Sequence, residues 1–425
     1  MDHQAPDDPQ PGHPQTDDRR LSTRQAAELL GVKPATVYAY VSRGQLTSRR
    51  DPVGRGSSFA AREVEELARR SRREASLPQA AAGSELAVRT GITLIEDDRY
   101  WYRGVDATEL AARHSYEEVA DWLWTGVLRR GIRFEAPAQM LAAARRPVAA
   151  LPEHSGPLDR LRVAAAAAAV ADPLRFDLSE EAVLGSARAL IPTLVGALPL
   201  AGRAHRGTGP LAWQLWSRLT AREADPVALE VLDLALALLI DHDLAASTLA
   251  VRVAASARAH PYAVVSAGLG ALEGPLHGAA GRLAHRMLAE VVEGGGAAPV
   301  VADHLRAGRR VPGLGHRLYR GEDPRATALF ARLEALPQAG PALAAARDVV
   351  ATTAARRPGL HANVDLALAV LTVSCGMPAE AGETVFAVAR TAGWIAHALE
   401  EYQERPLRMR PSGLYHGPRP PRPMP

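Results

Sequence analysis

VPGLGHRLYRGEDPR, residues 311–325, is the stretch on which the fold assignment of this chain rests. Gly313 and Gly315 precede His316, and two glycines before a histidine indicate irregular backbone close to a ligand. Arg320 and Arg325 follow, and guanidinium groups can hold anions through paired hydrogen bonds. An ordinary basic loop is the alternative interpretation, because arginine is abundant throughout the chain and Lys33 is its one lysine.

Polar residues interrupt the apolar helical pattern at two earlier places. Asp241, His242 and Asp243 directly follow a predicted apolar helix over 227–240, a pattern typical of either a capped surface turn or a site. His277 follows the helix-breaking pair Gly274-Pro275 and lies among small residues, which would let another molecule approach closely. Taken alone, this second pattern is better explained by a core histidine whose hydrogen bonds are satisfied within the protein.

Two further features lie towards the carboxyl end. Asn363, Val364 and Asp365 form a polar break, and a helix is predicted over 378–400. Within that helix Phe386, Arg390 and Trp394 are spaced i, i+4 and i+8, so they share one stripe. Arg390 is thus a cation on an aromatic face, which is a costly position without an anionic partner. Either a carboxylate of the protein or one of a substrate would serve.

Together these segments resemble the citrate synthase family in their order, their spacing and the residues they contain. The resemblance covers residues 84–417, with 129–225 matched only loosely. The stretches that carry it are the following: Gly83–Leu86, Thr90–Thr93, Tyr102–Asp106, Ser115–Ala120, Asp241–Leu244 with Ser247-Thr248, Gly274–Gly278, Pro312–Arg325, Asn363–Asp365, Ala389-Arg390, Gly393–His397 and Arg410-Pro411.

The resemblance implies a mostly α-helical homodimer whose subunits each have a large and a small domain. It implies condensation of acetyl-CoA with oxaloacetate, with no metal and no cofactor. By match to the family motifs, Asp365 would be the catalytic base, His277 would donate to the thioester carbonyl, and His316 would polarise and protonate the keto carbonyl of oxaloacetate. The binding residues implied in the same way are His242, Arg325 and Arg390 for oxaloacetate, Arg410 reaching in from the partner subunit, and Arg320 near the CoA phosphates.

Two other functions stay open at this point. One is a 2-methylcitrate synthase that uses propionyl-CoA. Propionyl-CoA differs from acetyl-CoA by one methylene, and a pocket discriminates one methylene by only ~1–3 kcal/mol. The other is a transcriptional regulator whose enzyme-like domain senses oxaloacetate, citrate or acyl-CoA.

Residues 19–75 form a small amino-terminal unit that favours the second alternative. Ser22 and Gln25 are spaced as a capping box at the start of a helix, Gly31 supplies a turn, and Pro34 opens a second helix. Two short helices joined by a glycine turn predict a helix-turn-helix. A Gly- and Arg-rich turn and a third helix follow, so the unit resembles the winged helix-turn-helix of excisionase and MerR-type regulators.

The charge of this unit is consistent with DNA binding. Residues 19–73 contain 13 basic and 5 acidic residues, whereas the whole chain has a formal net charge of only +3. A unit of the same shape that packs on the enzyme or a partner is the alternative. The predicted duplex DNA contacts are Thr36, Tyr38, Tyr40, Arg43, Arg49, Arg50 and Arg55.

Composition limits the remaining possibilities. The 425 residues contain one cysteine, Cys375, which excludes an intrachain disulfide and a cysteine-based zinc site. We expect a disordered tail over 1–18, a linker over 76–83 and a Pro-rich tail over 418–425. A short hairpin is predicted over 92–103, with Asp97-Asp98 at its turn. Without a secretory signal or an apolar stretch long enough to span a bilayer, a cytoplasmic protein that does not contact membranes is expected.

Overall fold

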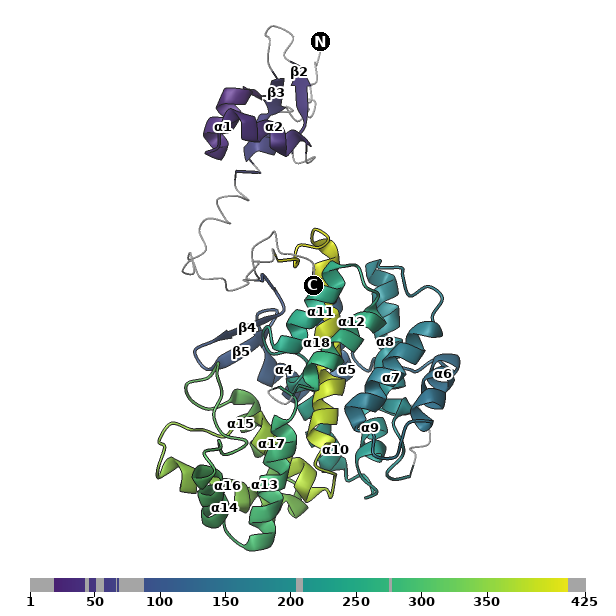
Figure 1. Cartoon of the computed structure of the whole chain (residues 1–425), viewed down its shortest axis with the longest axis vertical. Coiled ribbons are helices and arrows are strands. Elements are labelled where there is room, and N and C mark those ends of the chain that lie inside the picture. Colours follow the sequence, from purple (N-terminus) through teal and green to yellow (C-terminus); the bar gives the residue numbers. More distant parts are fainter. Residues whose placement is uncertain are drawn as a thin grey trace, which may run out of the picture. The chain divides into compact units, whose positions relative to one another are not determined.

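The computed structural model describes residues 19–42, 46–50, 57–65, 67–68, 88–203, 209–274 and 277–411. The chain divides into two compact units between Val88 and Arg89, and each is described by itself (Figure 1). The expected tails over 1–18 and 418–425 and the expected linker over 76–83 lie outside the described residues.

The amino-terminal unit is a helix pair beside a small sheet. Its elements are β1 (Arg20–Ser22), α1 (Thr23–Leu30), α2 (Pro34–Ser42), β2 (Ser48–Arg50) and β3 (Ser57–Ala60), and residues 61–65 and 67–68 are also helical. The three strands are antiparallel in the order β1-β3-β2. Phe59 and Val37 are fully buried in the core that joins helices and sheet. The predicted winged helix-turn-helix is confirmed.

Local sequence signals place the first helix of this unit. The Ser22 hydroxyl accepts from the Gln25 amide, and the Gln25 side chain accepts from the Ser22 amide, which is the predicted capping box. Gly31 then ends the helix in the left-handed region, with φ 67°.

The second unit begins with the predicted hairpin. Its strands are β4 (Thr93–Glu96), β5 (Arg99–Tyr102) and β6 (Val105–Asp106), all antiparallel. Asp97 and Asp98 both have positive φ, as a two-residue hairpin turn requires. The buried Tyr102 hydroxyl lies 3.1–3.3 Å from the backbone carbonyl oxygens of residues 237, 238 and 241, so the hairpin is tied to the end of a helix.

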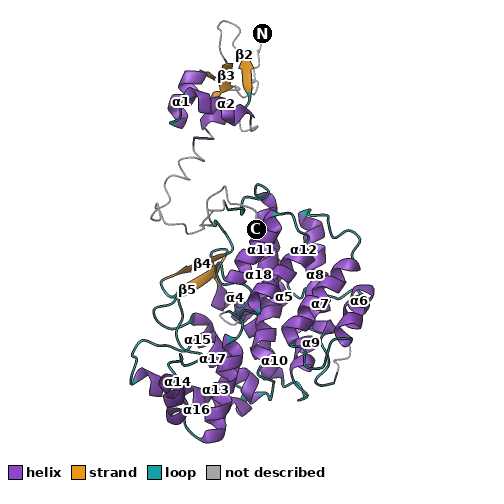
Figure 2. Cartoon of the chain, viewed as in Figure 1, coloured by secondary structure: helices purple, strands orange, loops and turns teal. Residues whose placement is uncertain are grey.

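Helices make up most of this second unit (Figure 2). One group surrounds α18: α4 (Ala107–Arg113), α5 (Tyr116–Thr125), α6 (Ala138–Ala149), α7 (Pro157–Val170), α8 (Glu180–Ala197), α9 (Leu211–Leu219), α10 (Pro226–Leu238), α11 (Ala246–Ser256), α12 (Pro261–Leu272) and α18 (Ala381–Gln403). A smaller group packs together beside it: α13 (Ala280–Gly294), α14 (Ala297–Arg306), α15 (Pro324–Leu333), the short η1 (Pro337–Ala339), α16 (Gly340–Ala354) and α17 (Val364–Ser374).

Helix α18 lies at the centre of this unit and organises it (Figure 1). Trp394 on α18 is fully buried, and a Cβ added at Gly268 of α12 would lie 2.7 Å from its ring. A Cβ added at Gly393 would lie 2.0 Å from the carbonyl oxygen of Ile240, so only glycine fits there. The close approach brings α18 directly against the polar turn at 241–243. None of the helices that the structure describes is long and apolar enough to cross a membrane.

Candidate active site

Two segments of the smaller helix group are joined by backbone hydrogen bonds. Gly315 donates to the His361 carbonyl at 2.7 Å, and the Asn363 amide donates to the Gly313 carbonyl at 2.9 Å. The Asn363 side chain also donates to the Gly315 carbonyl at 2.9 Å and caps α17 by accepting from the Asp365 amide. Gly313 and Gly315 have φ of +78° and +79°, which confirms the predicted irregular backbone. These bonds hold His316 and Asp365 in adjacent segments.

Asp323 fixes the arginine that follows it. One carboxylate oxygen accepts from Nε of Arg325 at 2.9 Å and the other from a terminal nitrogen at 2.8 Å. The second oxygen also accepts from the Val364 amide at 3.0 Å, next to Asp365. Burial acts to raise the pKa of Asp323, but the Arg325 guanidinium outweighs it and lowers the pKa overall. Arg325 is therefore a buried cation whose partner also anchors α17.

His242, His316 and Tyr319 form a compact aromatic cluster. The rings of His242 and His316 are 5.1 Å apart edge to face, and the Tyr319 hydroxyl lies 2.6 Å from Nε2 of His242. Nδ1 of His316 accepts from the Leu318 amide at 3.0 Å, so the proton of the neutral ring is on Nε2. Arg325 lies 5.8 Å from the Tyr319 ring. Tyr319 lies in the stretch 311–325 but was not predicted as a site residue.

The polar turn at 241–243 is not a surface turn. Asp241 is fully buried and His242 is 6% exposed, so the alternative of a capped surface turn is excluded for these two residues. Asp243 has φ 59° and ends the turn in the left-handed region. His242 thereby faces the cluster of His316 and Tyr319 instead of water.

Arg390 is 1% exposed and comes to the same region from α18. Its guanidinium lies 4.4 Å from the centre of the Phe386 ring, and its Nε donates to the Leu239 carbonyl at 2.9 Å. Among the described residues its side chain makes no ion pair within 4 Å. Burial lowers the pKa of Arg390, and the negative charge of Asp241 acts in the opposite direction.

His277 lies at the end of the turn after α12. Its Nε2 is 2.8 Å from the Ser247 hydroxyl, and its ring meets the edge of Phe386 at 6.1 Å. Gly278 is required by the chain itself, because an added Cβ would lie 2.3 Å from the carbonyl oxygen of Leu272. The approach of another molecule to the small residues around His277 stays a prediction. Ser247 is a contact that only the fold reveals.

The electrostatics of the site favour neutral histidines beside an ionised Asp365 at neutral pH. Burial and the positive charge of Arg325 lower the pKa of His316 to about 4 and hold the pKa of His242 well below its usual range. Burial and the charge of Arg390 lower the pKa of His277. Burial raises the pKa of Asp365 to about 6, against the influence of Arg325. At neutral pH the site therefore holds three neutral imidazoles and an ionised Asp365, together with the Asp323–Arg325 pair and the guanidinium group of Arg390.

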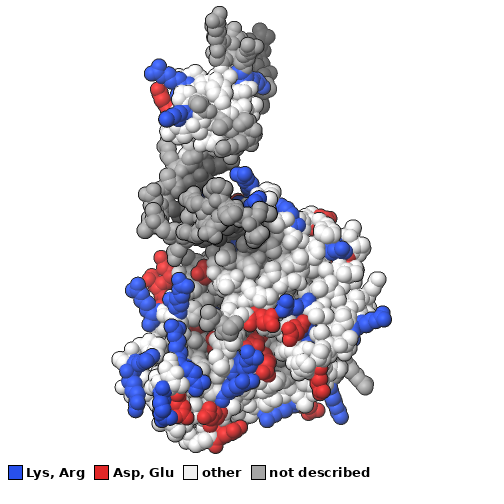
Figure 3. Space-filling model, viewed as in Figure 1, with Lys and Arg blue, Asp and Glu red and all other residues white. Residues whose placement is uncertain are grey.

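A cavity of about 580 Å³ adjoins His316 and Tyr319. Arg310, Arg317 and Arg357 line it together with apolar residues such as Leu360. Basic side chains gather over the part of the unit that contains α14 to α16 (Figure 3). The cavity suits a ligand that is partly apolar and carries several negative charges.

Two predicted binding residues lie apart from the groups described above. Arg320 is exposed, its backbone amide donates to Asp98 at 2.7 Å, and it is not among the residues that line the cavity, although Tyr319 and Gly321 are. Arg410 is exposed on the segment after α18, where its amide donates to the Leu407 carbonyl. Their predicted roles stay predictions.

Comparison with known proteins agrees with this geometry. Residues 83–412 match the model of the family described as citrate synthase, C-terminal domain. The chain belongs to the citrate synthase family. The citrate synthase of Haloferax volcanii is 33% identical over 340 residues, which cover 74% of this chain and 89% of that protein. A 2-methylcitrate synthase of Mycobacterium tuberculosis is 28% identical over 334 residues, with coverage of 74% and 84%.

A solved citrate synthase structure has the same fold. The crystal structure from Thermotoga maritima superposes with a TM-score of 0.64 at 26% identity and covers 82% of this chain and 98% of that one. Membership of the citrate synthase family makes the second unit an acyltransferase. Residues 20–72 match a helix-turn-helix domain model, which lies outside the citrate synthase match.

The residues predicted to contact DNA have different surroundings within the amino-terminal unit. Tyr38 is 48% exposed, Arg49 is exposed on β2, and Thr36 is half-buried. Tyr40 packs partly against the core of the unit. The side chains predicted to contact DNA that fall outside the described residues are those of Arg43, Arg50 and Arg55.

Proposed function

We propose that Asp365, His277 and His316 carry out the condensation of acetyl-CoA with oxaloacetate in this citrate synthase. The observation that supports these roles best is the set of hydrogen bonds that holds the segment of His316 against the segment of Asp365. Burial raises the pKa of Asp365 to about 6, and burial lowers the pKa of His316 to about 4 and lowers the pKa of His277. The reaction needs a base for a weakly acidic methyl group and neutral donors for two carbonyl oxygens. The site supplies both kinds of group.

The steps follow from these roles. Asp365 takes a proton from the acetyl methyl group while His277 donates a hydrogen bond to the thioester oxygen, which gives an enol-like carbon nucleophile. Because the Ser247 hydroxyl engages Nε2 of His277, Nδ1 is the ring nitrogen left for the substrate. The nucleophile attacks the keto carbon of oxaloacetate, and His316 gives a proton from Nε2 to the keto oxygen. Water then hydrolyses the thioester, releasing citrate and CoA.

Oxaloacetate is a dianion, and the site offers two buried guanidinium groups to hold it. Arg390 and Arg325 are 1% and 3% exposed, so their hydrogen bonds to a carboxylate form where water competes little. His242 completes this set as a neutral donor. We assign the cavity beside His316 to CoA, with its phosphates near the arginines that line it.

A homodimer is the assembly that we propose. Val170, Leu174 and Phe176 are 67–78% exposed around the connection between α7 and α8, an apolar surface that pairing with a second copy would cover. Arg410 is exposed on the carboxyl-terminal segment, where it is available to a partner's site. Light scattering of the purified chain tests this, and a monomeric mass would exclude it.

A thiol-release assay with oxaloacetate and two acyl-CoA thioesters tests the proposed reaction. We expect one thiol per citrate formed from acetyl-CoA, and a kcat/KM for propionyl-CoA that is lower by about 10- to 200-fold, because one methylene is worth roughly 1–3 kcal/mol. Faster turnover of propionyl-CoA would make the chain a 2-methylcitrate synthase. No thiol release from either thioester would favour the metabolite-sensing regulator.

DNA binding by the amino-terminal unit is a second candidate function. It is supported by the winged helix-turn-helix and by the exposed Arg49 on the β2–β3 wing. We expect the full chain to bind duplex DNA at low salt with an affinity that falls linearly on a log–log plot against salt. Arg49→Ala should weaken binding equally for all sequences and reduce that slope by about 1, measured by fluorescence anisotropy. Absence of binding at about 50 mM salt would leave the unit a packing or protein-binding module.

A further inference from the structure

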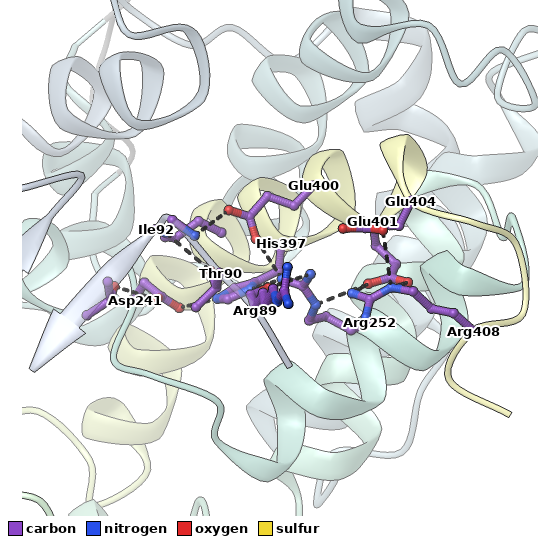
Figure 4. Close-up of polar contacts among 12 residues, drawn as sticks. Arg89, Thr90, Ile92, Asp241, Arg252, His397, Glu400, Glu401, Glu404 and Arg408 are labelled. Carbon is purple, nitrogen blue, oxygen red and sulfur yellow. Dashed lines mark hydrogen bonds and ion pairs between the residues drawn. The ribbon is translucent and has the colours of Figure 1, made fainter. Parts of the chain in front are cut away.

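A buried polar network joins α18, α11 and the polar turn that carries His242 (Figure 4). Asp241 and His397 are fully buried, and Arg252 of α11 is 1% exposed. His397 lies between the other two: its Nε2 is 3.2 Å from Oδ1 of Asp241, and its Nδ1 is 2.9 Å from a terminal nitrogen of Arg252. Thr93 of the hairpin donates to Oδ2 of Asp241 at 2.5 Å. We call these four residues the Asp241 relay.

The hydrogen bonds of the relay determine where its protons lie. A guanidinium group has donors and no acceptor, so Nδ1 of His397 must accept from Arg252. Nε2 of His397 therefore carries the hydrogen that is donated to Asp241. Asp241 thus receives hydrogen bonds from Thr93 and His397, and no arginine pairs with it directly among the described residues.

The charge of Asp241 acts on the pocket. Burial acts to raise the pKa of Asp241, but His397 and then Arg390 lower it, and Asp241 in turn opposes the effect of burial on the pKa of Arg390. Arg390 makes no ion pair of its own in the described chain. Asp241 is thus a counter-charge that stabilises Arg390 while leaving its terminal nitrogens to a substrate carboxylate.

The relay also fixes the relative position of two elements. His397 lies two turns after Arg390 on α18, and Asp241 directly precedes His242. The bond between His397 and Asp241 therefore joins the helix that carries one oxaloacetate ligand to the turn that carries another. The close approach of Gly393 to Ile240 and the bond from Arg390 to Leu239 reinforce the same junction.

Arg252, at the opposite end of the relay from Asp241, is also held by several hydrogen bonds. Arg252 donates to Glu400 at 2.7 Å, to Glu401 at 3.2 Å and to the Arg89 carbonyl at 3.3 Å. Burying so many charged groups costs several kcal/mol, and apolar side chains would stabilise the fold as well or better. This cost is explained if the relay fixes the positions of His242 and Arg390.

We propose that His397 and Asp241 are positioning residues that set His242 and Arg390 for oxaloacetate. The inference rests on the proposed roles of His242 and Arg390 as oxaloacetate ligands. A misplacement of about 1 Å costs on the order of 10²-fold in an enzyme site, so loss of the relay should act strongly on oxaloacetate and weakly on the thioester.

Calorimetric titration of the full chain with oxaloacetate, together with steady-state kinetics, tests this role. His397→Leu removes both hydrogen bonds, and we expect its Kd and KM for oxaloacetate to rise about 10- to 100-fold while KM for acetyl-CoA changes less than about twofold. His397→Gln can both accept from Arg252 and donate to Asp241, so it should restore most of the affinity. Glu404→Gln, at the exposed end of the wider network, is the matched control and should match the wild type.

Thr93→Val keeps the test decisive if His397→Leu does not fold. It removes the other donor to Asp241 from the hairpin, and we expect a several-fold rise in Kd for oxaloacetate. A wild-type Kd for oxaloacetate in both Thr93→Val and a folded His397→Leu variant would overturn the proposal. Equal losses of affinity for oxaloacetate and acetyl-CoA in these variants would also overturn it. Binding of oxaloacetate is measured without turnover, so failure of the proposed reaction appears separately, as a wild-type chain that binds oxaloacetate and releases no thiol.

Discussion

Replacing Asp365 with asparagine is expected to lower kcat for condensation by about 10³- to 10⁴-fold. The variant keeps the size and polarity of the side chain but cannot accept the methyl proton, and general-base catalysis is worth roughly 10²- to 10⁴-fold. We expect a loss in the upper part of this range because no other described carboxylate is proposed to take the methyl proton. The thiol-release assay with acetyl-CoA and oxaloacetate measures it, and near-parental turnover would show that Asp365 is not the base.

The pH dependence of the wild-type enzyme provides a second test of the same role. The base must be ionised, and burial raises the pKa of Asp365 to about 6. kcat/KM should therefore be level above about pH 7 and fall about tenfold per unit well below pH 6. Protonation of His316 cannot explain that fall, because its pKa is lowered to about 4.

Stability distinguishes a lost base from a lost fold. The folded-state pKa of Asp365, about 6, lies above the ordinary value of 3.8, so the folded chain binds this proton more tightly than the unfolded chain. Its stabilising contribution is present at low pH and is lost as pH rises through about 6. Asp365→Asn should thus be more stable than the wild type at pH 7, by up to about 3 kcal/mol. Thermal unfolding at pH 7 and near pH 4 measures this, and the difference should vanish at the lower pH.

Local signals in the sequence were sufficient for the turns and caps. Ser22 with Gln25, the hairpin turn at Asp97-Asp98 and the paired glycines 313 and 315 each act within a few residues, and the structure confirms all three. In each case the chemistry of the residue itself determines the local backbone. These are features for which neighbours along the chain provide most of the interaction energy.

Contacts between distant segments were beyond the reach of the same reasoning. The bond between Tyr319 and His242 joins residues 77 apart, and the bond between His397 and Asp241 joins residues 156 apart. The pattern at 241–243 could not distinguish a surface turn from a buried one, because the burial comes from α18 and the hairpin. Resemblance to the family named the catalytic groups, but only packing reveals what orients them.

Arg390→Met is expected to raise the Kd for oxaloacetate by about 10²- to 10³-fold. Methionine occupies a similar length beside Phe386, so the loss comes from the charged hydrogen bonds to a substrate carboxylate, and truncating one partner of a buried charged pair costs roughly 2–5 kcal/mol. Arg390→Lys keeps the charge but loses the planar fork and the Nε donor to Leu239, so it should recover only part of the affinity. Calorimetric titration with oxaloacetate measures both variants.

The fold should tolerate this change, which makes the result interpretable. Burial lowers the pKa of Arg390, so the cation is held in the core at a cost that methionine does not incur. Removing it takes the counter-charge from Asp241 but leaves that carboxylate its hydrogen bonds from Thr93 and His397, so we expect the unfolding temperature to fall while the chain still folds. Unchanged affinity for oxaloacetate in a folded Arg390→Met variant would mean that Arg390 is buried for packing on Phe386 alone, and the anion would then have to be held by Arg325 and His242.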